Sequence, residues 1–394
     1  MQHKIEKMVS FNNTEIAFRL KSNSQLQKAY YLFKIMGNPI LSKLGARLSE
    51  IAYTLHLPIN GIIRRTVFEQ FCGGESIERC SIKVNELAQS NIKTILDYSV
   101  EGKESEKDFN RTTKQTLASL DFAKTNKNIP FAVFKVTGLA RLDLLEKINY
   151  GKELTKEEQK EFDRVLHRIN KICKKAHQHK IPVMIDAEEC WIQDAIDEIV
   201  EDMMKAYNKE QAIVYSTLQM YRHDRLDYLK KSHKDSQING YFLGVKFVRG
   251  AYMEKENERA KKMGYATPIQ PNKEASNKDF DLALEYACEN IHGISICAGT
   301  HNEESSQYLI KLMKLHKIDK NDPKVYFAQL LGMSDHISFN LANDGYNTVK
   351  YVPYGPVKDV LPYLIRRAEE NTSIAGQTGR ELNLIMQERK RRKS

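Results

Sequence analysis

Eight short apolar runs, rich in β-branched and aromatic residues, constrain the fold of this chain more than any other feature. They occupy residues 92–99, 131–139, 181–189, 212–221, 241–252, 294–302, 324–335 and 347–355. Charged stretches with helical periodicity, such as residues 155–179, lie between most of them. Strands that alternate with helices in this way predict a (β/α)8 barrel rather than an open sheet, and residues 90 to 380 have the usual length for one.

Residues 1–90 show a different pattern of apolar residues. Their apolar residues recur at mixed spacings of three and four, with an interruption near Gly37, Asn38 and Pro39. We therefore expect an N-terminal helical region over 1–90, a barrel domain over 91–380 and a basic C-terminal tail over 381–394. The end of the tail, residues 388–394, is expected to be solvated or frayed.

A barrel places its active groups at the C-terminal ends of the strands. Lys135 ends the second run. Three roles are open for it: a side chain that reaches solvent, a cation paired to a carboxylate, or a Schiff-base lysine. Asp186 ends the third run, and a carboxylate at the end of an apolar strand is costly unless it is paired. Lys135 is its natural partner. The other polar, small and aromatic residues at strand ends are Ala187, Glu188, Glu189, Gln219, Arg249, Gly250, Ala251, Tyr252, Thr300, His301, Asn302, Leu330 and Tyr351.

The stretch Arg249–Tyr252 is the most specific of these. Gly250 and Ala251 allow the backbone to approach a ligand closely, and the adjacent arginine suits a phosphate or an electron-rich ring. The chain has neither a G-x-G-x-x-G nor a P-loop motif, so a nucleotide cofactor would have to bind in the barrel mouth. His301 has no second His or Cys at metal-ligand spacing. We expect it to contact a cofactor or make a structural hydrogen bond, and we predict no metal site.

After the eighth run, a helical stretch carries Tyr363, Arg366, Arg367 and Glu370 on one face. Two adjacent arginines often form only a solvated basic face. Alternatively, their planar guanidinium groups grip a carboxylate or phosphate. Because the helix follows the last strand directly, it can lie over the barrel mouth, and this location favours the clamp.

Composition sets broader limits. The net charge of +10 and the pI near 9.0 permit an anionic partner or a membrane surface without requiring one. The six cysteines show no C-x-x-C spacing and predict free thiols in a reducing compartment. No apolar run is long enough for a transmembrane helix, and the N-terminus lacks the apolar core of a signal peptide. We expect a cytoplasmic protein, peripheral on the inner face of the membrane if it contacts one.

Six motifs, in this order along the chain, resemble those of FAD-dependent proline dehydrogenases over roughly residues 90–375. They are IDAEE (185–189), KFVRGAY (246–252), THN (300–302), QLLGM (329–333), YVPYG (351–355) and YLIRRAEEN (363–371). The form is similar to the mitochondrial and related bacterial single-function enzymes rather than to the long bifunctional ones. We therefore expect a separate pyrroline-5-carboxylate dehydrogenase to perform the second oxidation.

The resemblance implies a distorted barrel that holds FAD at the strand C-termini, with a final helix capping the mouth. It assigns Arg366 and Arg367 to the proline carboxylate and gives Glu370 the role of holding one of these arginines. The residues implied to wall the proline ring are Tyr252, Leu330, Tyr351 and Tyr363. Those implied to contact FAD are Ala187, Gln219, Arg249, Gly250, Ala251, Thr300, His301 and Asn302.

The resemblance also implies a polar floor made by Lys135 and Asp186, and the expected catalytic residues are Lys135, Asp186 and Lys246. Lys246 stands where the bifunctional bacterial members have arginine, a departure that puts its contact near flavin N5 in doubt.

The reaction implied is oxidation of L-proline to 1-pyrroline-5-carboxylate by hydride transfer to N5 of FAD. It is the first step of proline catabolism to glutamate. Electrons would then pass to a quinone, which requires a peripheral membrane contact.

Three alternatives stay open. A hydroxyproline dehydrogenase has the same fold, but a smaller residue replaces the tyrosine at position 351 in that branch. A flavin-free lyase would use Lys135 as a Schiff base. A basic nucleic-acid-binding protein is a different class, and the chain carries no recognition motif for nucleic acid.

Overall fold

The computed structural model describes residues 9–38, 40–41, 44–45, 47–48, 55, 58–100, 104–373 and 377–394, except for the side chains of 368–373 and 377–378. Within this part of the chain, eight parallel strands form a closed barrel in sequence order, and β8 pairs with β1. The strands are β1 (Ile92–Tyr98), β2 (Phe131–Lys135), β3 (Val183–Asp186), β4 (Val214–Gln219), β5 (Leu243–Val248), β6 (Ile294–Gly299), β7 (Val325–Leu330) and β8 (Thr348–Tyr354). Each lies within one predicted run, so the (β/α)8 prediction is confirmed.

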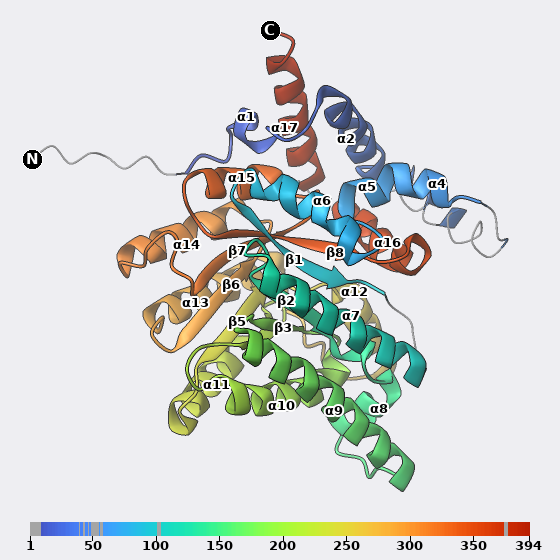
Figure 1. The fold of residues 1–394 in the computed structure, drawn as a ribbon, viewed down its shortest axis with the longest axis vertical. Coiled ribbons are helices and arrows are strands. Elements are labelled where there is room, and N and C mark those ends of the chain that lie inside the picture. The colour runs from blue at the N-terminus through green and yellow to red at the C-terminus, as the bar shows by residue number, and fades with distance from the viewer. Residues whose placement is uncertain are drawn as a thin grey trace, which may run out of the picture.

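Helices surround the barrel (Figure 1). Between the strands lie α7 (Glu106–Thr125), the 3₁₀ turn η2 (Val136–Gly138), α8 (Leu142–Asn149), α9 (Lys156–His179), α10 (Cys190–Tyr207), α11 (Arg225–Asn239), α12 (Met253–Met263), α13 (Lys273–Glu289), α14 (Glu303–Leu315) and α15 (Asp335–Asn343). Before β1 the chain forms α1 (Thr14–Ala17), α2 (Asn23–Met36), α4 (Asn60–Ile63), the π-helical turn η1 (Arg64–Phe68), α5 (Glu69–Phe71) and α6 (Ile77–Ala88). After β8 come α16 (Val357–Ser373) and α17 (Gln377–Arg391).

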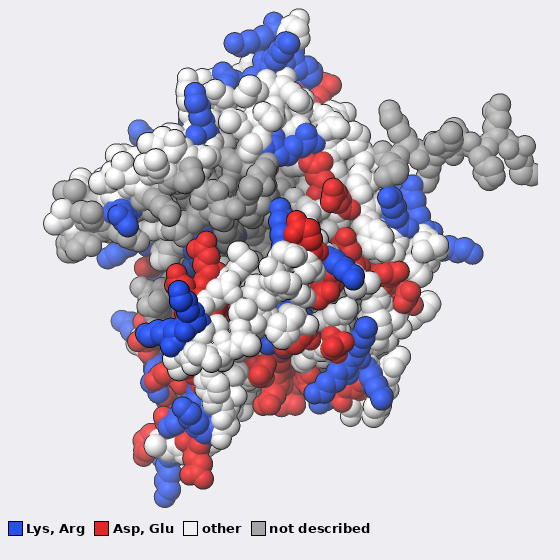
Figure 2. All heavy atoms as spheres, turned by 180° about the vertical axis from the view of Figure 1, so that it is seen from behind, with Lys and Arg blue, Asp and Glu red and all other residues white. Residues whose placement is uncertain are grey.

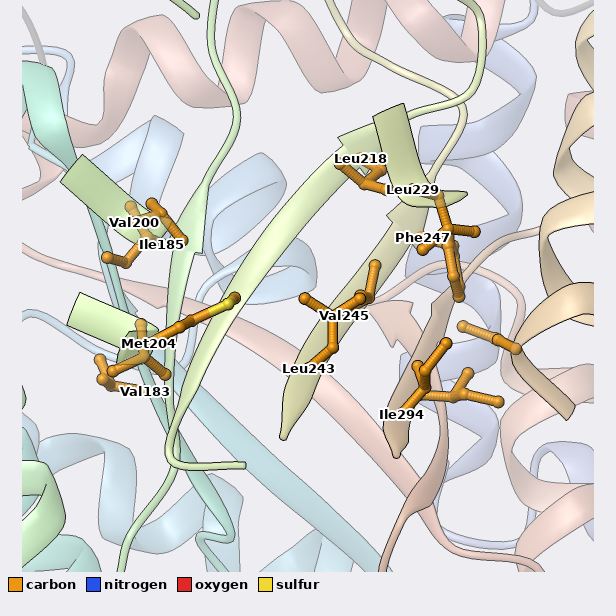
Figure 3. Packing of buried hydrophobic residues seen from close by; sticks show 14 of the residues in the cluster. Val183, Ile185, Val200, Met204, Leu218, Leu229, Leu243, Val245, Phe247 and Ile294 are labelled. Carbon is orange, nitrogen blue, oxygen red and sulfur yellow. The ribbon is translucent and has the colours of Figure 1, made fainter. Parts of the chain in front are cut away.

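The main core fills the layer between strands and outer helices. Strands covered on both faces have no solvated side, which is why they read as continuous apolar runs rather than alternating ones. Figure 3 shows Val183 and Ile185 of β3 beside Val200 and Met204 of α10, and all four are almost completely buried. This rigid layer fixes the positions at which the strands end.

A second core joins the two ends of the chain. Phe33 of α2, Phe71 of α5, Tyr363 of α16 and Leu384 of α17 belong to one buried cluster, together with Met333 from the loop after β7. The N-terminal helices and the last two helices therefore pack as one layer against the β7–α15 loop. As expected, a helix follows β8 directly, and this packing holds α16 in place.

The expectation that residues 388–394 are solvated or frayed is only partly confirmed: Lys390, Arg391, Lys393 and Ser394 are exposed, but the segment is not frayed. Helix α17 extends to Arg391, and Glu388 within it is fully buried. Glu388 accepts hydrogen bonds from Arg391 and Arg392, and Arg392 also donates to the backbone carbonyls of Phe18 and Lys21. The basic residues stay ordered because they neutralise a buried carboxylate and satisfy the carbonyls of the N-terminal segment.

The positive charge is not gathered into one broad patch on the face seen in Figure 2. Lys and Arg cluster at the top of that view, where Figure 1 places the end of α17, and elsewhere on the face both signs are interspersed. This distribution gives no support to an extended nucleic-acid-binding surface on that face.

Candidate active site

Asp186 is the centre of a buried polar cluster at the C-terminal end of β3. Its carboxylate lies 3.0 Å from Nζ of Lys135, its register partner on β2, and forms a second ion pair with Lys246 of β5. It also accepts hydrogen bonds from the hydroxyl of Tyr351 at 2.9 and 3.1 Å. The predicted pairing of Lys135 with Asp186 is confirmed, and Lys246 joins the same group.

The lysine charges in this cluster keep the Asp186 carboxylate ionised. Burial alone would raise the pKa of Asp186, but the charges of Lys246 and Lys135 outweigh it and hold the pKa well below its usual range. The carboxylate therefore stays ionised between Lys135 and Lys246. Lys246 Nζ also lies 5.0 Å from the centroid of the Tyr351 ring.

The arginine pair on α16 is not a solvated basic face. Arg367 is 8% exposed, and its guanidinium lies 5.1 Å from the centroid of the buried Tyr363 ring. Arg366 is half-buried and lies close enough to influence the charge of Tyr252. The side chain of Glu370 lies outside the described residues.

Aromatic and apolar groups link the helix to the floor. Tyr252, at the N-terminus of α12, lies within electrostatic range of both Lys135 and Arg366. Leu330, at the end of β7, contacts both the barrel interior and the cluster that contains Tyr363. Tyr351 and Tyr363 are also close enough to interact. Tyr252, Tyr351, Tyr363 and both arginines thus lie near one another at the end of the barrel that carries Asp186.

Arg249, directly after β5, is a half-buried cation with neutral partners. It donates to Asn277 at 2.7 Å, to Thr300 at 2.6 Å and to Ser305 at 2.9 Å. Burial lowers its pKa to about 10, although the more distant Asp281 and Glu304 favour the charged form. A half-buried guanidinium that contacts no carboxylate among the described residues is suited to bind an anion such as a pyrophosphate.

Gly250 gives the backbone beside Arg249 a shape that other residues cannot adopt without strain. Its φ is +131°, and a Cβ there would lie 2.5 Å from the ring of Tyr221. The exposed Ala251 continues the same turn. This stretch therefore presents bare backbone next to an anion-binding side chain, and both features fit a dinucleotide cofactor such as FAD.

The remaining cofactor candidates lie on neighbouring strand ends but differ in what they offer. The Gln219 amide donates to the Glu188 carbonyl at 2.6 Å, and the Asn302 side chain caps α14 through the Ser305 N–H at 2.8 Å. Thr300 accepts from Arg249, while His301 lies 2.9 Å from the hydroxyl of Ser334. Ala187, next to Asp186, is only partly buried.

Three residues of this region were not assigned a role from the sequence. Glu188 accepts from the backbone N–H of Thr137 at 2.9 Å, and burial raises its pKa to about 7. Lys350 of β8 is fully buried and pairs with Asp335 at 2.9 Å. Ser334 contacts His301. The position of Glu188 at a strand end was the one available signal, whereas Lys350 reads as an ordinary strand residue and Ser334 as a loop residue.

The comparisons with known proteins agree on one family. A family model described as proline dehydrogenase matches residues 80–380. Proline dehydrogenase 1, mitochondrial, of Dictyostelium discoideum is 32% identical over 94% of this chain and 73% of its own length. A hydroxyproline dehydrogenase of Xenopus laevis is 29% identical over 95% of this chain and 88% of its own length.

Among solved structures, proline utilization A of Bdellovibrio bacteriovorus superposes on 91% of this chain with a TM-score of 0.71 and 18% sequence identity. This chain spans only 38% of the length of that protein. At this level of identity the likeness supports the barrel fold alone.

Proposed function

The chain belongs to the proline dehydrogenase family and is an enzyme that oxidises proline, and from this premise we propose how its barrel mouth performs the reaction. We propose that L-proline binds between α16 and the Asp186 cluster and leaves as 1-pyrroline-5-carboxylate. This proposal rests mainly on Arg367 of α16. Arg367 is buried and lies close enough to the strand-end residue His301 for its charge to affect the pKa of that imidazole.

The positively charged side chains determine which protonation state of proline binds. Arg366 and Arg367 grip the carboxylate, with charge-assisted bonds that fix its orientation. The ammonium groups of Lys135 and Lys246 disfavour a further positive charge nearby, so the secondary amine is proposed to bind in its neutral form. Tyr252, Leu330, Tyr351 and Tyr363 enclose the ring and exclude water from it, and Glu370 is proposed to hold one of the arginines.

The neutral amine supplies the electron pair of the new bond. FAD held here would supply the oxidising group, accepting the hydride from the ring carbon beside nitrogen as the nitrogen lone pair forms the C=N bond. The iminium form of the product would then lose its N–H proton to water to give the imine. Lys135, Asp186 and Lys246 form the charged floor of the proposed substrate site.

The residues proposed to hold FAD form an arc along strand ends β3 to β6. Arg249 would hold the pyrophosphate, and the backbone at Gly250 and Ala251 would allow it to approach closely. Thr300 and His301 lie beside Arg249, and the other members of the set are Ala187, Gln219 and Asn302. The fit depends on the neutral partners of Arg249 and on the φ of Gly250 described above.

We further propose that electrons pass to a quinone at a membrane surface. No helix in the described residues is long and apolar enough to cross a bilayer. However, the N-terminal region exposes large apolar side chains, with Ile40 77% and Ile62 66% exposed, and we propose that they form one apolar face. The other large exposed side chains of the proposed face are Tyr31, Ile35, Leu41, Leu44, Leu48 and Leu55.

The charge around this apolar face favours a lipid surface. Between residues 28 and 68 the sequence has six Lys or Arg residues and one acidic residue. An apolar face interleaved with basic side chains is typical of segments that lie in the interface of an anionic membrane. We propose that the face contacts anionic lipid on the inner side of the membrane.

The proposed reaction is tested by spectroscopy of the purified protein. We expect bound flavin whose absorption bleaches when L-proline is added without oxygen. Protein that takes up no FAD would overturn the cofactor assignment. Flavin that stays oxidised with proline but bleaches with hydroxyproline would favour the alternative substrate suggested by the Xenopus relative.

A further inference from the structure

Ser334 has a backbone conformation that is unusual for its position. The described non-glycine residues with positive φ are Asn91, Lys180, Lys317 and Ser334. The first three lie at or just after the C-terminal ends of helices, where left-handed residues are common. Ser334, with φ +50°, stands instead at the N-terminus of α15. Strain of this kind persists only where surrounding contacts impose it.

The hydroxyl of Ser334 is also not used in the usual way. A serine at the N-terminus of a helix normally accepts a hydrogen bond from the first turn, but this one makes no capping bond. Its Oγ lies 2.9 Å from Nδ1 of His301, at the end of β6. The left-handed backbone thus directs the hydroxyl towards a residue of the proposed cofactor site.

The strained loop is held by distant parts of the chain. Glu381 of α17, which is 3% exposed, accepts a hydrogen bond from the Ser334 N–H. Lys350 of β8 donates to the Met333 carbonyl at 2.5 Å, and Gln70 of α5 donates to the Gly332 carbonyl at 2.8 Å. The first contact holds Ser334 itself, and the other two hold the two residues before it.

His301 has two distinct ring nitrogens in this environment. Burial lowers its pKa to about 3, helped by the charges of Lys350 and Arg367, so the imidazole is neutral. A neutral imidazole has one donor and one acceptor nitrogen, and a hydrogen bond at one of them decides the role of the other. With Nδ1 in contact with Ser334, Nε2 is the ring nitrogen that would interact with a cofactor bound beside His301.

We infer that Ser334 is a positioning residue of the FAD site: its hydroxyl fixes the His301 imidazole, and Glu381 on the last helix fixes Ser334. The inference rests on the proposed function, because it requires that FAD binds beside His301. It gives α17 a role in cofactor binding although the helix lies outside the barrel.

The test measures the Kd of FAD for the apoprotein by quenching of flavin fluorescence. Ser334→Gly removes the hydroxyl but keeps the left-handed backbone, which glycine adopts without strain. We expect the Kd to rise about fivefold, the usual effect of losing one neutral hydrogen bond, with no drop in the Tm of the apoprotein. Ser236→Ala, which removes a buried hydroxyl bonded only within α11, should leave the Kd unchanged.

A second set of variants separates positioning from a general structural role. In a His301→Ala background, Ser334→Gly should cause no further loss of FAD affinity, because it acts through the imidazole. Glu381→Gln should weaken FAD binding in the His301 wild type and not in His301→Ala. Equal losses in both backgrounds, or a Ser334→Gly protein with wild-type affinity, would overturn the inference. Failure of the wild-type apoprotein to bind FAD would instead overturn the proposed function.

Discussion

The hydroxyl of Tyr351 on β8 donates to the carboxylate of Asp186 on β3, at 2.9 and 3.1 Å across the mouth of the barrel. The same carboxylate pairs with Lys135 and Lys246. Tyr351 therefore has two separable parts: a ring that encloses the proposed substrate and a hydroxyl that belongs to the charged floor. Substitutions can remove one part without the other.

Tyr351→Ser should shift preference towards hydroxyproline, because the small side chain makes room for a ring hydroxyl. We expect the ratio of kcat/KM for hydroxyproline over proline to rise, since discrimination is differential binding of transition states. Tyr351→Phe is the matched control: it keeps the ring and loses the bond to Asp186. It should lower kcat without changing the ratio. An unchanged ratio in Tyr351→Ser would show that this ring does not wall the substrate.

Arg366→Met and Arg367→Met should each weaken proline binding far more than folding. Loss of one partner of a buried charge pair costs about 2–5 kcal/mol, or about 30-fold to several thousand-fold in affinity. We expect rises of this size in KM, and parallel losses for inhibitors that keep a carboxylate but lack the amine. The control is Arg79→Met, an exposed arginine on α6. Wild-type KM values in both α16 variants would mean that no clamp exists.

Glu188→Gln should flatten the pH dependence of stability. The pKa of Glu188 in the folded protein is about 7, above its ordinary value of 4.5, so the folded state keeps a proton that the unfolded chain loses. The stability from this group is complete below pH 4.5 and is lost as the pH rises through 7, up to about 3 kcal/mol.

The measurement is urea unfolding of the wild type and the variant at pH 5 and pH 8. The free energy of unfolding should change less between pH 5 and pH 8 in Glu188→Gln than in the wild type. The variant lacks the one proton that Glu188 contributes. The exposed Glu157→Gln on α9 should behave as the wild type does. An unchanged slope in Glu188→Gln would mean that this carboxyl is ionised in the folded protein below pH 7.

Binding to anionic vesicles should depend on the N-terminal apolar face. The triple variant Ile40→Ser, Leu44→Ser, Leu48→Ser should sediment less with phosphatidylglycerol vesicles, because it removes the side chains that enter the lipid interface. Ile238→Ser and Leu315→Ser, at positions 74% and 72% exposed on other helices, provide the control. Added salt should weaken wild-type binding by screening the basic side chains.

Two results would contradict this assignment. Equal sedimentation of the triple variant and the wild type would place the lipid contact elsewhere. A wild-type dimer that becomes a monomer in the triple variant would show that the face joins two copies of the chain.

The sequence by itself determined the barrel and most of the candidate site. Apolar runs of strand length indicate buried parallel strands because both faces of each strand are covered, so the pattern is local and readable. The ends of those runs located Lys135 and Asp186, and helical periodicity placed Arg366 and Arg367 on one face of a helix.

Only the tertiary structure decided which side chains meet across the barrel. Tyr351 and Asp186 are 165 residues apart, and the ring of eight strands is what brings them together. The order of the C-terminal residues also depends on contacts distant in sequence, because the buried Glu388 and the backbone carbonyls near Phe18 hold them in place. The left-handed backbone of Ser334 depends on contacts with Glu381, and a loop serine gives no local sign of it. Periodicity in the sequence indicates whether a residue is buried. It does not indicate which partner compensates a buried charge or a strained backbone, because that partner comes into contact only when the tertiary fold forms.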